Sequence, residues 1–308
     1  MGEGTKSSMR DFFPVFSMVG LFVLIHGLAL LIVGPFEAAD VVVFDDPNAP
    51  MNLVFFFCTL LLTTIVILLI ARFWKKKVIQ GIILGLIGYF AFYVFYSLLG
   101  IIIAEVWSLF LSIVAAAILV VALVKYPEWY VINACCIIVG VGAIAIFGIS
   151  LSILLVIVLL IGMATYDAIA VYRTKHMIDL ADTVLDLRLP LVLVIPKIRQ
   201  YSLIKDTKRL KAKLEEGEER QAFFMGLGDV IIPGFLVAST FHNITGNGLL
   251  MALSVMLGTL VGFAVLMKAV VKGNPQAGLP YLCSGAILGY VVSSYLLYGQ
   301  LVGLGFPM

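Results

Sequence analysis

Apolar runs of about 20 residues follow one another along almost the whole chain, and this feature restricts the fold most strongly. Each run can cross a bilayer once as an α-helix, since a helix rises about 1.5 Å per residue. Hydrophobic residues make up 62% of the 308 residues and charged residues only 12%, which is too apolar for a soluble domain. We therefore expect an all-α, polytopic membrane protein.

Nine membrane-spanning helices are expected. Two apolar runs, 78–124 and 129–172, are each about twice the length of one crossing, so each predicts a helical hairpin. We treat residues 1–308 as one membrane domain, in which 1–172 holds spans one to six, 173–220 is a cytoplasmic loop and 221–308 holds spans seven to nine. The spans are expected at 13–34, 53–73, 78–100, 103–124, 129–148, 150–172, 221–241, 247–270 and 279–302. The first of them is expected to stay as an anchor, because it is too long for the apolar core of a signal peptide.

The positions of Lys and Arg predict the orientation. With nine spans, all 20 of these residues fall on the side of the N-terminus, and the opposite loops hold only acidic charges such as Asp45 and Glu105. Since basic residues concentrate in cytoplasmic loops, we expect the N-terminus inside and the C-terminus outside. The protein is thus expected to be a multi-pass protein of the cell membrane.

Cysteine and histidine show no metal-site or disulfide pattern. The four cysteines lie inside apolar runs, and the three histidines are scattered, with no H-E-x-x-H sequence. We expect no metal and no other cofactor.

The inside loop contains the short apolar stretch "LRLPLVLVIPKIRQY". Its apolar core is too short to span a membrane, and Pro190 and Pro196 argue against a regular helix. A short extended or interfacial segment is the simpler interpretation, and a pseudo-substrate or self-cleavage segment is the alternative. The charge-dense stretch that follows favours a solvated helix.

Two carboxylates stand out because they lie inside apolar spans. Of the 18 acidic residues, only Asp167 and Asp229 do so, and an ionisable group in a span is costly and marks a functional site. Counted from Arg173 and Arg220, they lie about 9 Å and about 13 Å from the inner boundary. They can therefore face each other if spans six and seven touch.

Two carboxyl groups at close range do not readily both ionise, and a pair that shares one proton can activate water. The ionised carboxylate takes a proton from the water, and the protonated one hydrogen-bonds the scissile carbonyl. Gly226 and Gly228 are expected to let another backbone approach that face of the helix, although from the glycines alone ordinary helix packing is the favoured explanation.

The motifs around these aspartates resemble a known family. Tyr166-Asp167 and Gly226-Leu227-Gly228-Asp229 are similar to the Tyr-Asp and Gly-x-Gly-Asp motifs of the intramembrane aspartyl proteases, which include presenilin and signal peptide peptidase. The orientation resembles presenilin, and "VIIPG" after Asp229 is closer to signal peptide peptidase. A prokaryotic, archaeal presenilin homologue would combine these features. The resemblance implies an aspartic endopeptidase that cleaves within transmembrane helices, with Asp167 and Asp229 as its catalytic residues.

The family's third motif, Pro-Ala-Leu, has an imperfect counterpart in "NPQAGLPYLCSG". One register gives Ala277-Gly278-Leu279 before Pro280, and the other gives Pro280-Tyr281-Leu282. We expect residues 277–282, with part of the long loop, to hold an unwound substrate strand by β-augmentation. The candidate substrate-binding residues are Tyr166, Gly226, Leu227, Gly228, Ala277, Gly278, Leu279 and Pro280.

Other functions were weighed against proteolysis. A proton- or cation-coupled transporter also uses paired carboxylates, but the chain shows no internal repeat. A rhomboid-like serine protease would need a histidine opposite Ser284, and a purely structural subunit would leave both aspartates unexplained. The expected partners are transmembrane-helix peptides and the lipid bilayer. Nucleic acid is not expected, a homo-oligomer stays open, and no obligate subunit is indicated.

Overall fold

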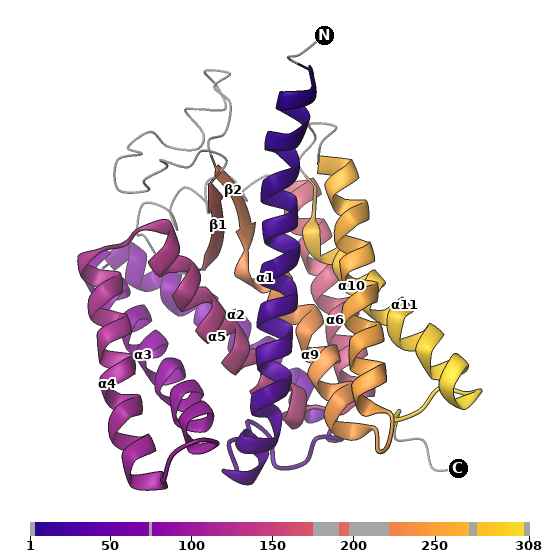
Figure 1. The fold of residues 1–308 in the computed structure, drawn as a ribbon, viewed down its shortest axis with the longest axis horizontal. Helices are drawn as coiled ribbons and strands as arrows, with labels where there is room; N and C mark the ends of the chain where they lie inside the picture. The colour runs from indigo at the N-terminus through magenta and orange to yellow at the C-terminus, as the bar shows by residue number, and fades with distance from the viewer. Residues whose placement is uncertain (1–3, 74–75, 175–190, 197–221, 271–275, 305–308) are drawn as a thin grey trace.

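A bundle of long helices encloses a small two-stranded sheet near one end (Figure 1). The computed structural model describes residues 4–73, 76–174, 191–196, 222–270 and 276–304. Within these residues the chain forms nine α-helices, one π-helical turn and two strands. In chain order these are α1 Gly4–Ala38, α2 Met51–Phe73, α3 Lys76–Gly100, α4 Glu105–Lys125, α5 Trp129–Ser150, α6 Ile153–Ile169, η1 Ala170–Thr174, β1 Val192–Pro196, β2 Ala222–Gly226, α9 Leu227–Asn243, α10 Gly248–Val270 and α11 Gly278–Tyr298.

Among the described residues, seven helices are long and apolar enough to cross a membrane. The two others are α2, of which Met51–Thr63 counts as a shorter apolar helix, and α9, which has 17 residues. Both hairpins break where the sequence predicted, since α3 ends at Gly100 and α5 ends at Ser150. Large apolar side chains remain exposed along α4, among them Val106, Phe110 and Ile118, as expected for a helix that faces lipid.

The prediction of a helix over 221–241 is wrong at its start. Residues Ala222–Gly226 form β2, and the helix begins only at Leu227. The molecule is mostly helical, as predicted, and this sheet is a local departure from the all-α expectation. The β-branched and aliphatic stretch Val192–Pro196 forms β1 and pairs antiparallel with β2, with Leu193 opposite Met225. The extended interpretation of that stretch is thus confirmed.

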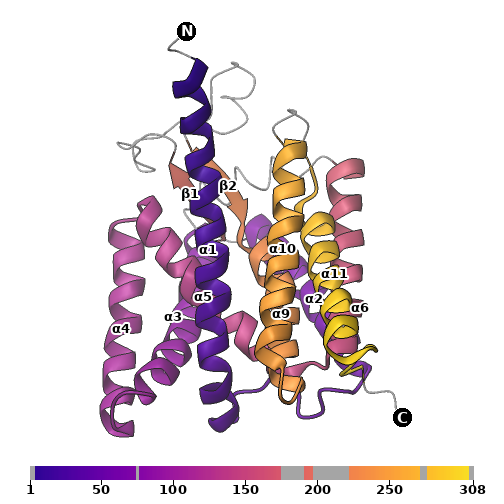
Figure 2. The ribbon, with the colours of Figure 1, turned by 45° about the vertical axis from the view of Figure 1, so that its right-hand side comes forward.

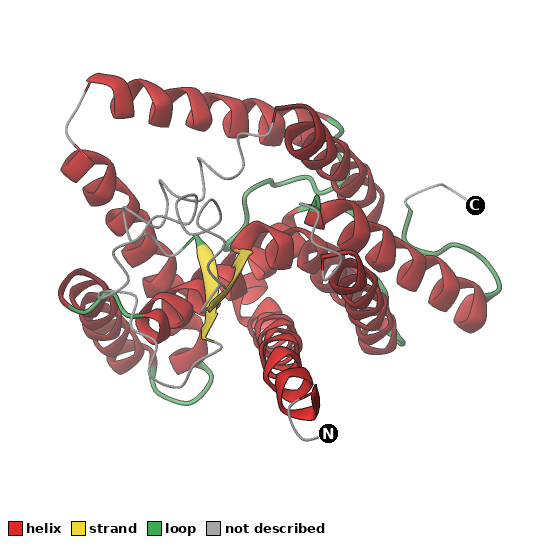
Figure 3. Cartoon of the chain, turned by 90° about the horizontal axis from the view of Figure 1, so that it is seen from above, coloured by secondary structure: helices red, strands yellow, loops and turns green. Residues whose placement is uncertain are grey.

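Helix α9 lies in the interior and contacts α1, α5, α6, α10 and α11 (Figure 2). Its residues Ile232–Thr240 are all buried. Seen from above, the two strands also lie among the helices (Figure 3). The strand-to-helix junction at Gly226 is therefore held inside the bundle.

Helices α10 and α11 pack with their backbones almost in contact. A β-carbon added to Gly258 would lie 2.3 Å from the carbonyl oxygen of Gly285, and one added to Gly262 would lie 2.3 Å from that of Tyr281. Because only glycine permits this approach, the two helices form one closely packed pair. This pair fixes the position of the first turn of α11.

Polar contacts join the loops at the opposite end from the strands. Ser239 of α9 donates a hydrogen bond to the carbonyl of Leu151 at 2.9 Å, and the N–H of Ser152 bonds the carbonyl of Pro47 at 2.9 Å. These contacts tie the α5–α6 turn to α9 and to the loop after α1.

Candidate active site

Asp167 lies near the end of α6, just before the π-helical turn η1. Its side-chain oxygen Oδ2 accepts the backbone N–H of Leu279 at 3.1 Å, and the backbone N–H of Gly278 also interacts with it. Gly278 and Leu279 form the first turn of α11, whose N-cap residue Ala277 supplies no side-chain acceptor. Asp167 therefore caps α11 from a different helix. The Asp167 carboxyl thus supplies an acceptor for N–H groups that α11 itself leaves unpaired.

Asp229 lies in the first turn of α9, three residues after the end of β2. A β-carbon added to Gly278 would lie 2.9 Å from its Oδ2, and one added to Gly226 would lie 3.5 Å from the same oxygen. Asp229 is also close enough to Asp167 for their charges to interact. The residues Asp167 and Asp229 are both half-buried.

The first turn of α11 thus touches both carboxyl groups. Gly278 packs against Asp229, while Leu279 donates to Asp167. The structure brings together the two aspartates that the sequence singled out, and it places one register of the Pro-Ala-Leu-like segment, Ala277-Gly278-Leu279, beside them. These residues are helical from Gly278 onward, so in this structure residues 278–282 do not present the open backbone edge that holding a substrate strand by β-augmentation needs.

The remaining candidate residues differ in their burial and in their position relative to the two aspartates. Gly226 ends the strand rather than lying on a helix, which corrects the expectation that it clears a helix face. A β-carbon at Gly228 would meet nothing within 4 Å, so its surroundings are open. Leu227 is buried, and Tyr166 is 58% exposed, on the surface of α6. Pro280 is half-buried in the first turn of α11.

Sequence reasoning missed Asn133 of α5. Its side-chain amide donates to the carbonyl of Val194 at 2.7 Å, and its oxygen accepts the N–H of Val194 at 2.9 Å. The side chain therefore pairs with β1 as a neighbouring strand would. A lone asparagine in an apolar span was the signal that could have identified it.

This pairing determines which edge of the sheet is open. Because Val194 turns its N–H and C=O toward Asn133, its cross-strand partner Phe224 must turn its own N–H and C=O away from β1. Gly226 follows two residues later and faces the same way. Among the described residues, the outward groups of Phe224 and the N–H of Gly226 have no backbone partner beyond the sheet. Gly226 is the N-cap of α9, so its carbonyl accepts the first hydrogen bond of that helix. The open edge of β2 leads directly to Asp229.

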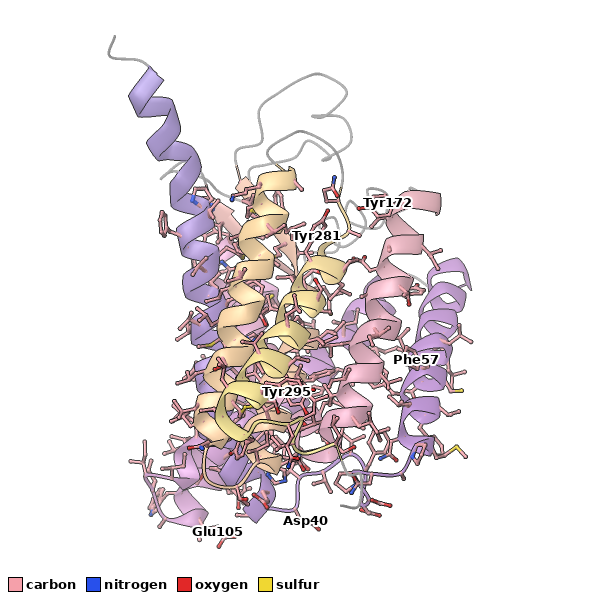
Figure 4. All side chains as sticks on the ribbon, turned by 90° about the vertical axis from the view of Figure 1, so that its right-hand side faces the viewer. Asp40, Phe57, Glu105, Tyr172, Tyr281 and Tyr295 are labelled. Carbon is pink, nitrogen blue, oxygen red and sulfur yellow. The ribbon has the colours of Figure 1, made fainter. Side chains whose placement is uncertain are left out.

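A second polar contact links η1 to α11 and to the residue Gln276 just before it. The hydroxyls of Tyr172 and Tyr281 donate to the side-chain oxygen of Gln276 at 3.0 Å and 3.4 Å. Figure 4 shows both tyrosines near the end opposite Asp40 and Glu105. Within the described residues, no group of His, Cys, Asp and Glu side chains could hold a metal ion.

Comparisons with known proteins agree on one family. The model of the family "Signal-peptide peptidase, presenilin aspartyl protease" matches residues 19–298. Two solved structures of a presenilin family intramembrane aspartate protease are similar to this chain. The one in space group P2 is 34% identical, with a TM-score of 0.69, and the one in C222 is 31% identical, with a TM-score of 0.67. Each comparison covers 93% of this chain and 99% of the other. No curated protein matches the chain.

Proposed function

The chain belongs to the signal-peptide peptidase and presenilin family of aspartyl proteases, and from this premise we propose that Asp167 and Asp229 are its catalytic pair. The protein is an integral membrane protein and an intramembrane aspartyl protease, and nothing in the comparisons supports a transporter. The observation that carries the assignment is the first turn of α11, where neighbouring residues touch one carboxyl group each.

We further propose different roles for the two carboxyl groups. Asp167 bonds the N-terminus of α11 and is the ionised member, so it accepts the proton of the attacking water. Asp229 is the protonated member and donates a hydrogen bond to the scissile carbonyl oxygen. The water oxygen adds to the carbonyl carbon. Asp167 then passes the proton that it took from the water to the amide nitrogen. The C–N bond breaks, two peptides are released, and the pair returns to its starting state with Asp167 ionised and Asp229 protonated.

The substrate is proposed to be a transmembrane helix of another protein, locally unwound. The backbone amides of an intact helix bond one another and shield the scissile bond, so the unwound segment needs new partners. The outward N–H and C=O groups of Phe224 and the N–H of Gly226 can pair with it as a neighbouring strand would. The open surroundings of Gly228 then leave room for the substrate backbone beside Asp229.

The same proposal includes the membrane topology. We propose nine spans, with the N-terminus and the strands on the cytoplasmic side of the cell membrane and the C-terminus outside. In support, α1 begins and α11 ends at opposite ends of the bundle (Figure 1). Helices α2 and α9 would complete the nine spans. No obligate subunit is proposed.

The proposed activity is tested with the purified protein and a synthetic single-span peptide, with and without a transition-state analogue directed at aspartyl proteases. We expect cleavage within the apolar part of the peptide and its loss when the analogue is added. Cleavage that the analogue leaves unchanged would contradict the two-carboxyl mechanism.

A further inference from the structure

His26 of α1 is a buried side chain that the proposed chemistry does not use. It is 0% exposed, and its ring packs edge-on against Phe22 with ring centres 5.8 Å apart. Its Nε2 lies 3.0 Å from the carbonyl oxygen of Val230. Because a carbonyl oxygen only accepts, Nε2 carries the hydrogen and Nδ1 is left as a bare acceptor. That Nδ1 is buried and has no hydrogen-bond partner among the described residues. Burying an acceptor without a hydrogen bond lowers the stability of the fold.

The acceptor of this bond lies next to the active site. Val230 directly follows Asp229 in α9. Pro233 lies in the same helix and has no N–H, so the carbonyl of Asp229, four residues earlier, lacks its usual helical donor. The first turn of α9 is therefore joined to the rest of the helix by one backbone bond fewer. His26 adds a bond from α1 at the very next carbonyl.

Gly234 provides the space for this contact. A β-carbon at this position would lie 3.0 Å from Nε2 of His26 and 2.5 Å from Cδ1 of Ile144. A side chain at this position would crowd both Ile144 and the ring of His26. The missing helical bond at Pro233, the space at Gly234 and the donor on α1 thus combine at one place.

We propose that His26 is a positioning residue for Asp229. Its Nε2–H fixes the first turn of α9 against α1 and so keeps the Asp229 carboxyl beside Asp167 and Gly278. This inference rests on the catalytic role proposed for Asp229. It predicts an effect on the rate of the chemical step rather than on substrate binding.

The test compares His26→Gln, His26→Asn and His26→Phe in liposomes with a single-span peptide. The amide nitrogen of Gln is as many bonds from Cα as Nε2 of His, whereas that of Asn is one bond closer and does not reach Val230. We expect His26→Phe and His26→Asn to lower kcat at least about tenfold with KM within about twofold, and His26→Gln to keep about a third of kcat or more.

A second variant reports on the same contact. Gly234→Ala should lower kcat similarly, and adding it to His26→Phe should cause little further loss, because both remove one interaction. Val33→Ala is the matched control, since Val33 is 2% exposed on the same face of α1, two turns away. It should lower the melting temperature while keeping kcat.

Two results would overturn the inference. One is equal kcat for His26→Gln and His26→Asn, and the other is a kcat of His26→Phe equal to that of Val33→Ala. Asp229→Asn in the same assay separates a failure of the positioning role of His26 from a failure of the catalytic role of Asp229. If it is inactive, such results overturn the positioning role alone. If it is active, the catalytic role of Asp229 fails and the positioning role fails with it.

Discussion

At the scale of single residues, Gly278 lies where any side chain would crowd Asp229, one of the two proposed catalytic residues. A β-carbon there would lie 2.9 Å from Oδ2 of Asp229, so Gly278→Ala must displace the carboxyl group or the helix. We expect kcat to fall roughly 10- to 100-fold, because small misplacements of catalytic groups are costly. Steady-state kinetics on the single-span peptide measure this. Wild-type kcat in Gly278→Ala would contradict the placement of Asp229.

Gly228→Ala should not crowd the active site as Gly278→Ala does. The surroundings of Gly228 are open in the free enzyme, and it lies within the first turn of α9, so Gly228→Ala should stabilise the fold by about 0.4–1 kcal/mol. If the substrate backbone passes there, KM should nevertheless rise by about threefold or more. A thermal melt and peptide kinetics on one preparation test both effects. An unchanged KM would remove Gly228 from the substrate path.

The two aspartates could be predicted from sequence because each is an isolated charge in an apolar span. The depth of about 13 Å expected for Asp229 assumed helical rise from Arg220. That estimate does not apply, because Ala222–Gly226 form a strand. The contact of Leu279 with Asp167 could not be predicted. It depends on where α11 begins, and the sequence around Pro280 allowed two registers. The bond from His26 to Val230 joins residues 204 positions apart, and no local pattern encodes such a contact.

At the scale of elements, the sheet is the part that the sequence described least well. Its two strands are short and lie within or beside apolar stretches, where a helix and a buried strand look alike. Pro190 and Pro196 identified the first strand as extended. Nothing in "AFFMG" marked the second, which the hydropathy assigned to a helix, and only its pairing with β1 makes it a strand.

Asn133 is predicted to hold this sheet in place. Asn133→Leu removes both hydrogen bonds to Val194 and leaves a buried N–H and a buried C=O unpaired, at about 1–3 kcal/mol each. We expect kcat/KM to fall at least about tenfold. The control is Ile132→Ala, which removes buried volume at the next residue without touching these bonds. Equal kcat/KM in the two variants would argue against a role for the sheet.

At the scale of the whole molecule, the distribution of charge predicted the topology. Helix α4 offers a clean test, because Glu105 and Lys125 lie at its two ends. In a background without the exposed Cys58, a membrane-impermeant maleimide on intact cells should label Glu105→Cys and not Lys125→Cys. Permeabilised cells should label both. Labelling of Lys125→Cys alone in intact cells would invert the topology.

The central claim is that Asp167 and Asp229 together carry out the cleavage. The most direct measurement is the cleavage rate of the single-span peptide by Asp167→Asn, Asp229→Asn and the matched control Asp45→Asn, which alters an exposed acid at the far end of the bundle. Both catalytic variants should fold normally and fall below about 1% of the wild-type rate, while Asp45→Asn stays near wild type. Near-wild-type cleavage by either Asp167→Asn or Asp229→Asn would contradict the account.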